Sequence, residues 1–388
     1  MNTAGIIAEF NPFHNGHRYL VDCVRESGAE CVAAVMGGSF LQRGECAVID
    51  KFSRAEAAVL GGVDIVFELP QVFACASAEV FAFGGAEVLK ACGAVDTLCF
   101  GSECGDAESL LRAQRMLQSL SVAKYTSKGY SYARAFRAAA EDKGLSEAAK
   151  LLDSPNNTLA LEYIKASDGA FDIFTVERTA AHNDGESGAF ASASVVRRLI
   201  FDNDDTYLKY VPETTAAVIE REMKAGRCPA ALQRNERGVL SVLRRMSAEE
   251  LSTLPGVSEG LENRFLEAIR SSDTIEGILT QVKCKRYTHT RLSRTIACAY
   301  LGIKKEDVTS PQYIRVLAFN DRGAELLKKM KTTATLPVVM NARDIKALKG
   351  DAARMIDLDI KATDLFALCT PTIQPCGDDY YKSAVKRG

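Results

Sequence analysis

Short apolar runs and longer amphipathic segments alternate four times over the first 120 residues of the chain. The runs at residues 4–10, 31–37, 63–70 and 95–103 are apolar at most positions rather than at alternate ones. Strands of this kind are buried on both faces, which is typical of a parallel sheet covered by helices on either side. We therefore expect an α/β doubly wound fold that binds ligands at the carboxyl ends of its strands.

The second half of the chain has a different pattern. Between residues 239 and 303, segments with helical periodicity follow one another without intervening strands. A small strand–helix–strand unit is expected at residues 313–340. The 388 residues allow two or three domains, and the pattern predicts an α/β domain at residues 1–205 followed by a mainly helical domain at residues 206–388.

Composition excludes several classes of protein. Hydrophobic residues make up 47% and charged residues 25% of the chain, as in ordinary globular proteins. No apolar run reaches the roughly 18 residues of a membrane-spanning helix, and no basic segment precedes the first short apolar stretch. The 12 cysteines include no Cys-x-x-Cys pair, so we expect reduced thiols in the cytoplasm, no contact with a membrane and no protein metal site.

The turn after the first strand carries the strongest chemical signal. His14 and His17 flank Gly16 directly before a predicted helix, and they are two of only four histidines in the chain. Backbone N–H groups at a helix N-terminus favour an anionic phosphate, and a glycine lets a nucleotide approach closely. The two imidazoles can donate hydrogen bonds to phosphate oxygens. On spacing alone, ordinary capping histidines are the alternative, but the position after a buried strand favours a phosphate site.

A second phosphate-binding segment is expected near residue 195. Ser192 and Ser194 open a helix that continues through Arg197. Serine hydroxyls at a helix start can hold a phosphate, and the forked donors of Arg197 can clamp it. We take His14, His17 and Arg197 as the candidate catalytic residues.

Positive charge is concentrated in one part of the helical half. Residues 277–305 contain no Asp or Glu but seven Lys or Arg. This pattern is typical of a surface that binds a phosphate backbone, and an aromatic ring within it can stack on a base. The candidate RNA-binding residues are Lys283, Lys285, Arg286, Tyr287, Arg291 and Arg294.

The His-x-Gly-His turn and the Ser-x-x-x-Arg segment are similar to the signature of the nucleotidylyltransferase superfamily, whose HUP-type domain transfers AMP from ATP. Three further segments resemble one family of this superfamily, the bacterial tRNA(Met) cytidine acetate ligases. They are residues 36–70, 100–103 and 154–166. The resemblance extends from residue 5 to about residue 302. It implies that the first domain is catalytic and binds ATP, and that the second binds tRNA.

The resemblance also implies the site residues. ATP contacts are expected from the segment after the first strand, from a strand end at Gly101, from one of the two asparagines of the Pro-Asn-Asn turn, and from Arg178. The full set is Ile7, Ala8, Glu9, Phe10, Asn11, Pro12, Phe13, His14, Asn15, Gly16, His17, Arg18, Tyr19, Leu20, Gly101, Asn156, Asn157, Arg178 and Ser194. The candidate substrate-site residues are Gln42, Arg43, Lys51 and Arg54.

The implied reaction has two steps. Acetate attacks the α-phosphate of ATP, with Mg²⁺ expected on the phosphates, and N4 of the wobble cytidine of elongator tRNA(Met) then takes the acetyl group. Recognition of an unpaired anticodon-loop base fits this chemistry. One alternative is a small-molecule adenylyltransferase, which needs only about 150 to 200 residues. Another is a non-catalytic RNA-binding protein regulated by a nucleotide, which would bind ATP without acetate-dependent release of pyrophosphate.

Overall fold

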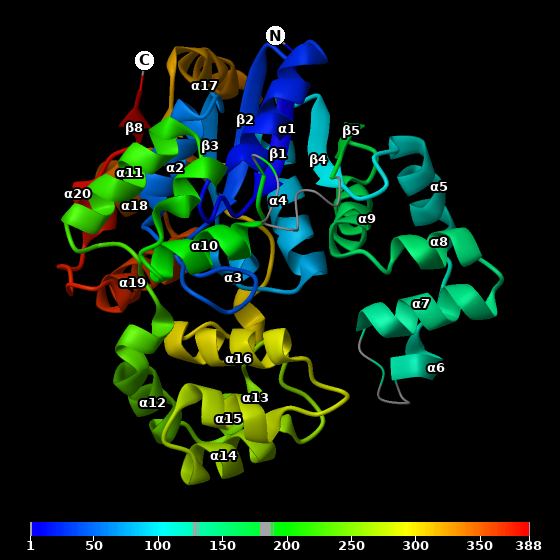
Figure 1. Ribbon diagram of the computed structural model, residues 1–388, viewed down its shortest axis with the longest axis vertical. Helices are drawn as coiled ribbons and strands as arrows, with labels where there is room; N and C mark the ends of the chain where they lie inside the picture. Colours follow the sequence, from blue (N-terminus) through cyan, green and yellow to red (C-terminus); the bar gives the residue numbers. More distant parts are fainter. Residues whose placement is uncertain (1, 127–129, 131, 179–187, 189, 388) are drawn as a thin grey trace.

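The computed structural model describes residues 2–126, 130, 132–178, 188 and 190–387. Its centre is an eight-stranded sheet in the order β5-β4-β1-β2-β3-β6-β7, with β8 paired to β6 (Figure 1). The strands β1 to β5 are parallel to one another, which confirms the predicted α/β class. They span β1 (Thr3–Ala8), β2 (Cys31–Gly37), β3 (Ile65–Leu69), β4 (Thr97–Ser102) and β5 (Asp172–Glu177).

Both faces of the sheet are buried, which explains why the strands are apolar at successive positions. Ile6 and Ala34 are in register and belong to one hydrophobic core, whereas their neighbours Ile7 and Val35 belong to the other. The first core includes residues of α1 (Asn15–Glu26), α2 (Lys51–Leu60), α10 (Ala193–Phe201) and α11 (Glu213–Lys224). The second includes residues of α3 (Gln71–Ala74), α4 (Ala78–Cys92) and α9 (Pro155–Ser167).

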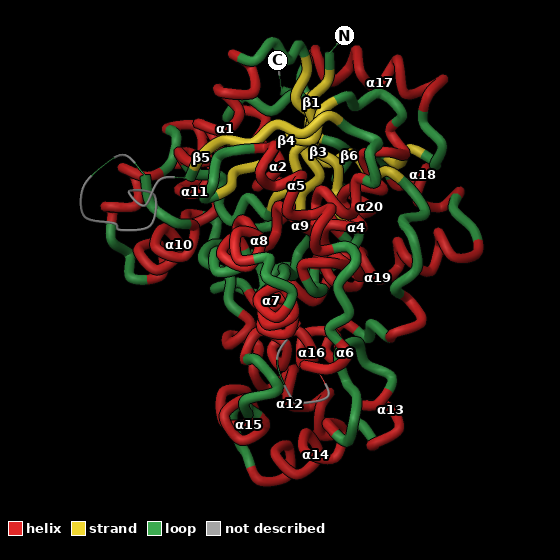
Figure 2. Tube along the Cα trace, turned by 90° about the vertical axis from the view of Figure 1, so that its right-hand side faces the viewer, coloured by secondary structure: helices red, strands yellow, loops and turns green. Residues whose placement is uncertain are grey.

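Two helical lobes extend from this body (Figures 1 and 2). The first lies beside α9 and comprises α5 (Ala107–Leu117), α6 (Ala123–Thr126), α7 (Tyr132–Asp142) and α8 (Ser146–Leu151). The second comprises α12 (Glu236–Arg245), α13 (Ala248–Ser252), α14 (Leu261–Ser271), α15 (Ile275–Val282) and α16 (His289–Leu301). In this second lobe α16 lies nearest the sheet.

The last part of the chain returns to the sheet. It comprises β6 (Ile314–Phe319), α17 (Asp321–Thr333), β7 (Val338–Val339), α18 (Ala342–Ala347), α19 (Gly350–Phe366), α20 (Asp378–Tyr381) and β8 (Val385–Lys386). Strand β6 pairs antiparallel with β3, so the strand–helix–strand unit expected at residues 313–340 extends the sheet of the first domain. The prediction places residues 206–388 in a second, mainly helical domain. It does not account for β6, β7 and β8, which belong to the sheet of the first domain.

A buried ionic cluster joins this returning segment to the first half of the chain. The Lys51 ammonium lies 2.8 Å from the Glu68 carboxylate and 2.9 Å from that of Asp379. Arg315 of β6 contacts the same two carboxylates, at 3.4 Å from Glu68 and 2.6 Å from Asp379. Burial of each charge is compensated by opposite charges, so loss of one member leaves the others unpaired. No helix in the described residues is long and apolar enough to cross a membrane.

Candidate active site at the ends of β1, β4 and β5

The His-x-Gly-His turn begins α1 immediately beyond β1. The His14 side chain caps the helix by accepting a hydrogen bond from the backbone N–H of Gly16 (3.1 Å). In return, Nδ1 of His17 accepts a hydrogen bond from the backbone N–H of His14 (3.2 Å). The two rings stack with centroids 3.7 Å apart. The histidines are thus capping residues, as the structural alternative proposed, and the same capping fixes both rings at the end of β1.

The protonation state of His17 follows from its surroundings. Burial lowers its pKa well below 6.5, and electrostatic interactions with His14 and with the Arg178 guanidinium lower it further. The neutral ring accepts at Nδ1, so its proton is on Nε2. His17 therefore presents a neutral hydrogen-bond donor at pH 7.

Buried aromatic side chains pack against the ring of His17. The rings of Phe10 and Phe13 are almost fully buried and lie 4.9 Å and 5.6 Å from the His17 ring, centroid to centroid. Ile7 is also buried in the core. These three side chains face the core, so the ATP contacts expected along residues 7–20 would come from the backbone at these positions. The three side chains fix the backbone that carries His14 and His17.

The end of β4 meets the end of β5 beside this turn. Gly101 is paired with Val176, and the backbone N–H of Arg178 donates to the carbonyl of Ser102 (2.7 Å). A Cβ on Gly101 would lie 3.0 Å from both Cγ and Cδ of Arg178. Burial lowers the pKa of Arg178, while the nearby Glu103 raises it. The predicted pair Gly101 and Arg178 is thus in contact at the carboxyl edge of the sheet.

The Pro-Asn-Asn turn joins the same edge through Glu103. Its carboxylate accepts from the backbone N–H of Asn157 (2.7 Å) and from both the backbone and the side-chain amide of Asn156 (3.2 and 2.8 Å). The side-chain oxygen of Asn157 accepts from the backbone N–H of Cys104 (3.1 Å), and Asn157 is buried. Asn156 is the more exposed of the two, which favours it as the ligand. The local sequence does not indicate that Glu103 caps a helix, because its partners Asn156 and Asn157 lie 53 and 54 residues away.

The helix that begins after Ser192 and contains Arg197 reaches the histidine turn directly. Ser192 caps α10, its hydroxyl lies 3.0 Å from that of the exposed Ser194, and both sit at the helix start. The Nη1 atom of Arg197 donates to the backbone carbonyl of Asn11 (2.9 Å). Burial lowers the pKa of Arg197, and Glu45 and Glu9 oppose that shift. Two motifs separated by 186 positions in the sequence are therefore adjacent in space.

Comparison with known proteins agrees with this geometry. A model of the HIGH Nucleotidyl Transferase family matches residues 1–379. A tRNA(Met) cytidine acetate ligase of Acetivibrio thermocellus is 34% identical, and the match covers 99% of this chain and 100% of the relative. One of Thermotoga maritima is 37% identical, with 95% and 96% covered. The chain belongs to the tRNA(Met) cytidine acetate ligase family. A crystal structure of T. maritima TmcAL bound with alpha-thio ATP matches with a TM-score of 0.92 and 34% identity, over 100% of this chain and 99% of that one.

Two of the substrate-site candidates taken from the ligase family pattern are corrected by the structure. Lys51 is fully buried in the ionic cluster with Glu68. Arg54 is also fully buried, and its guanidinium donates to the backbone carbonyls of Glu9 (2.7 Å) and Gly37 (2.9 Å). Both cations therefore hold the fold together instead of facing a substrate.

The other two candidates lie on the loop after β2. Arg43 is exposed, and the backbone N–H of Gln42 donates to the Glu9 carboxylate (2.9 Å). The carbonyl of Gln42 accepts from Nη1 of Arg294 on α16 (3.1 Å). This loop thus links the end of β1 to the basic segment of the ligase chain.

The basic segment is only partly available to RNA. Lys283 and Lys285 are exposed, whereas Arg286 is ion-paired with Glu259. Tyr287 is 5% exposed and packs in the core, with the Arg291 guanidinium 4.9 Å from its ring centroid. The expectation that Tyr287 stacks on a base is therefore wrong, since the ring is already covered.

Proposed function

We propose that the protein uses ATP to ligate acetate to N4 of the wobble cytidine of elongator tRNA(Met). The observation that carries this proposal is the hydrogen bond from Arg197 to Asn11, which sets α10 against the His14–His17 turn in a member of this ligase family. An acetate oxygen attacks the α-phosphorus of ATP, and pyrophosphate leaves. The cytidine N4 then attacks the acetyl carbon and loses a proton as AMP leaves.

The first step needs positioning and charge neutralisation rather than a general base. Acetate is already an anion at pH 7, so no proton has to be removed from it. His17 offers a neutral donor, and Arg197 offers forked cationic donors. We expect both groups to face the ATP phosphates, where charge grows as the bond to pyrophosphate breaks.

We expect Mg²⁺ to act as the counterion of the ATP phosphates. The described residues contain no group of three or more His, Cys, Asp or Glu side chains placed to hold a metal ion. In nucleotide sites Mg²⁺ is usually bound by substrate phosphates, water and one or two carboxylates. When bound, the ion neutralises phosphate charge.

Exposed cations of the helical lobe support the tRNA part of the proposal. Lys283 and Lys285 lie on the loop before α16, whose residue Arg294 is hydrogen-bonded to the loop after β2. RNA bound along this loop is therefore led toward the carboxyl edge of the sheet.

Acetate-dependent exchange of labelled pyrophosphate into ATP, without tRNA, tests the first step. We expect exchange with acetate and none without it. An exchange rate that does not depend on acetate but increases with a nucleotide or coenzyme precursor would support the small-molecule adenylyltransferase instead. Binding of ATP and tRNA without any exchange would support the regulatory RNA-binding protein.

A further inference from the structure

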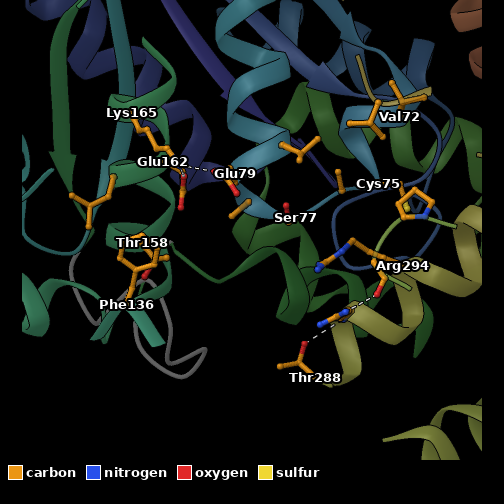
Figure 3. Close-up of a pocket in the computed structure, with 18 of the residues that line it drawn as sticks. Val72, Cys75, Ser77, Glu79, Phe136, Thr158, Glu162, Lys165, Thr288 and Arg294 are labelled. Carbon is orange, nitrogen blue, oxygen red and sulfur yellow. Dashed lines mark hydrogen bonds and ion pairs between the residues drawn. The ribbon is translucent and has the colours of Figure 1, made fainter. Parts of the chain in front are cut away.

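A cavity of about 740 Å³ lies apart from the histidine turn, between α9 and α16 (Figure 3). None of its lining residues belongs to residues 7–20. One wall includes Phe136, Leu161 and Glu162, and the opposite wall includes Arg291 and Arg294. The cavity thus has an apolar wall that carries the carboxyl groups of Glu79 and Glu162, and a wall that carries the guanidinium groups of Arg286, Arg291 and Arg294.

One carboxylate oxygen of Glu162 lacks a hydrogen-bond partner among the described residues. This atom, Oε2, is buried and accepts no hydrogen bond from them. The nearest cation, Lys165, stays 3.9 Å from that oxygen and lies 2.5 Å from the carboxylate of Glu79 instead. Burial raises the pKa of Glu162. A buried oxygen of this kind is costly unless a ligand donates to it.

The facing arginines are suited to a phosphate. Among the described residues, neither Arg291 nor Arg294 has a carboxylate within 4.0 Å. Arg291 donates to the carbonyl of Gly256 (2.7 Å), and Arg294 donates to that of Gln42 (3.1 Å). Each guanidinium has five N–H donors, so both keep donors for an anion at the N-terminus of α16.

Two hydrogen bonds connect the wall of the cavity to the end of β1, beside the proposed ATP site. Arg294 binds the carbonyl of Gln42, whose own N–H binds the Glu9 carboxylate at the end of β1 (2.9 Å). Cys75, which follows β3 and α3, also lines the cavity. A ligand in the cavity therefore lies beside the carboxyl edge of the sheet.

We propose that this cavity receives the wobble cytidine, extruded from the anticodon loop before acetyl transfer. This inference rests on the proposed function. The oxygen of Glu162 accepts a hydrogen bond from the exocyclic amine of cytosine, as carboxylates do when they read this base. Phe136 and Leu161 cover the base, and Arg291 and Arg294 bind its phosphate.

Substitution of Glu162 tests the proposal. Glu162→Leu is expected to raise the KM for tRNA about 10-fold, because a buried amine loses its acceptor. Glu162→Gln keeps an amide oxygen and is expected to stay within about 3-fold of wild type. Glu79→Gln is the matched control, because Glu79 lines the same cavity but already has Lys165 as a partner. Acetate-dependent pyrophosphate exchange is expected to be unchanged in all three variants.

Binding of an anticodon stem-loop gives a readout that does not require catalysis. A stem-loop whose wobble base is pyrimidin-2-one lacks the exocyclic amine, and the wild-type protein is expected to bind it about 10-fold more weakly than the cytosine form. Glu162→Leu is expected to bind the two forms equally. Equal binding of both forms by the wild-type protein would overturn the inference, even if exchange with acetate is normal. Absence of exchange in the wild type would count against the proposed function alone.

Discussion

The imidazole rings of His14 and His17 stack with their centroids 3.7 Å apart, and the backbone N–H of His14 donates to Nδ1 of His17. This pairing ties the orientation of His17 to the cap of α1. It also places the proton of the neutral ring on Nε2, opposite the capping bond. We therefore expect His17 to act as a neutral donor to the ATP phosphates.

The pH dependence of adenylation tests this role. The pKa of His17 lies well below 6.5, so the ring is already neutral at neutral pH. We expect kcat/KM for ATP in acetate-dependent exchange to keep the same pH profile in wild type and His17→Gln between about pH 6 and 8, at a lower level in the variant. A wild-type rate that rises toward pH 6, with no such rise in the variant, would show that His17 acts in its charged form.

Arg197 and its neighbour Arg198 form a matched pair. Arg197 reaches the histidine turn, whereas Arg198 is exposed on the same helix. Arg197→Met is expected to lower kcat/KM for exchange about 100-fold, because a cationic donor to the transition state is lost. Arg197→Lys keeps the charge but not the fork, so a smaller loss of about 10-fold is expected. Equal losses in Arg197→Met and Arg198→Met would contradict the assignment.

A substitution at Gly101 tests whether the nucleotide binds at the end of β4. In Gly101→Ala the new methyl group would push against the flexible Arg178 side chain, 3.0 Å away. We expect the KM for ATP to rise about 10-fold and the free energy of unfolding to change by less than about 1 kcal/mol, as measured in urea. Gly144→Ala is the control. Its φ of 72° and open surroundings predict a loss of stability without a change in KM.

Asp359 gives a prediction about stability. Burial raises its pKa to about 7, helped by the charge of Glu68, although it accepts hydrogen bonds from Gln71 and Tyr313. The unfolded carboxyl group has a pKa near 3.8, so the folded state binds the extra proton between these values. The contribution of Asp359 to the free energy of unfolding is therefore fully present below pH 3.8 and is lost as pH rises through 7.

We therefore expect the unfolding free energy of wild type minus that of Asp359→Asn to fall from pH 5 to pH 7, by up to about 1.4 kcal/mol per pH unit. Titrating groups that do not interact with Asp359, such as His17, cancel when the two proteins are compared. A difference that stays constant or rises over this range would contradict the assignment.

Features encoded by neighbouring residues could be predicted from the sequence. The alternation of strands and helices, the turn at His14 and the helix start at Ser192 were all evident in local patterns. The roles of Lys51 and Tyr287 were not, because burial depends on distant partners. Lys51 meets Asp379 from the other end of the chain, and Tyr287 packs beneath Arg291 in a segment whose charges indicate exposure. The pairing of β6 with β3 was missed for the same reason.

Transfer of ¹⁴C-acetate to tRNA tests the central claim most directly. Unmodified elongator tRNA(Met) is incubated with labelled acetate, ATP and either wild type or His17→Ala, and then digested to nucleosides. We expect label in N4-acetylcytidine with the wild type and at least about 100-fold less with the variant. Unlabelled RNA from reactions in which the wild type still forms AMP and pyrophosphate would contradict the account.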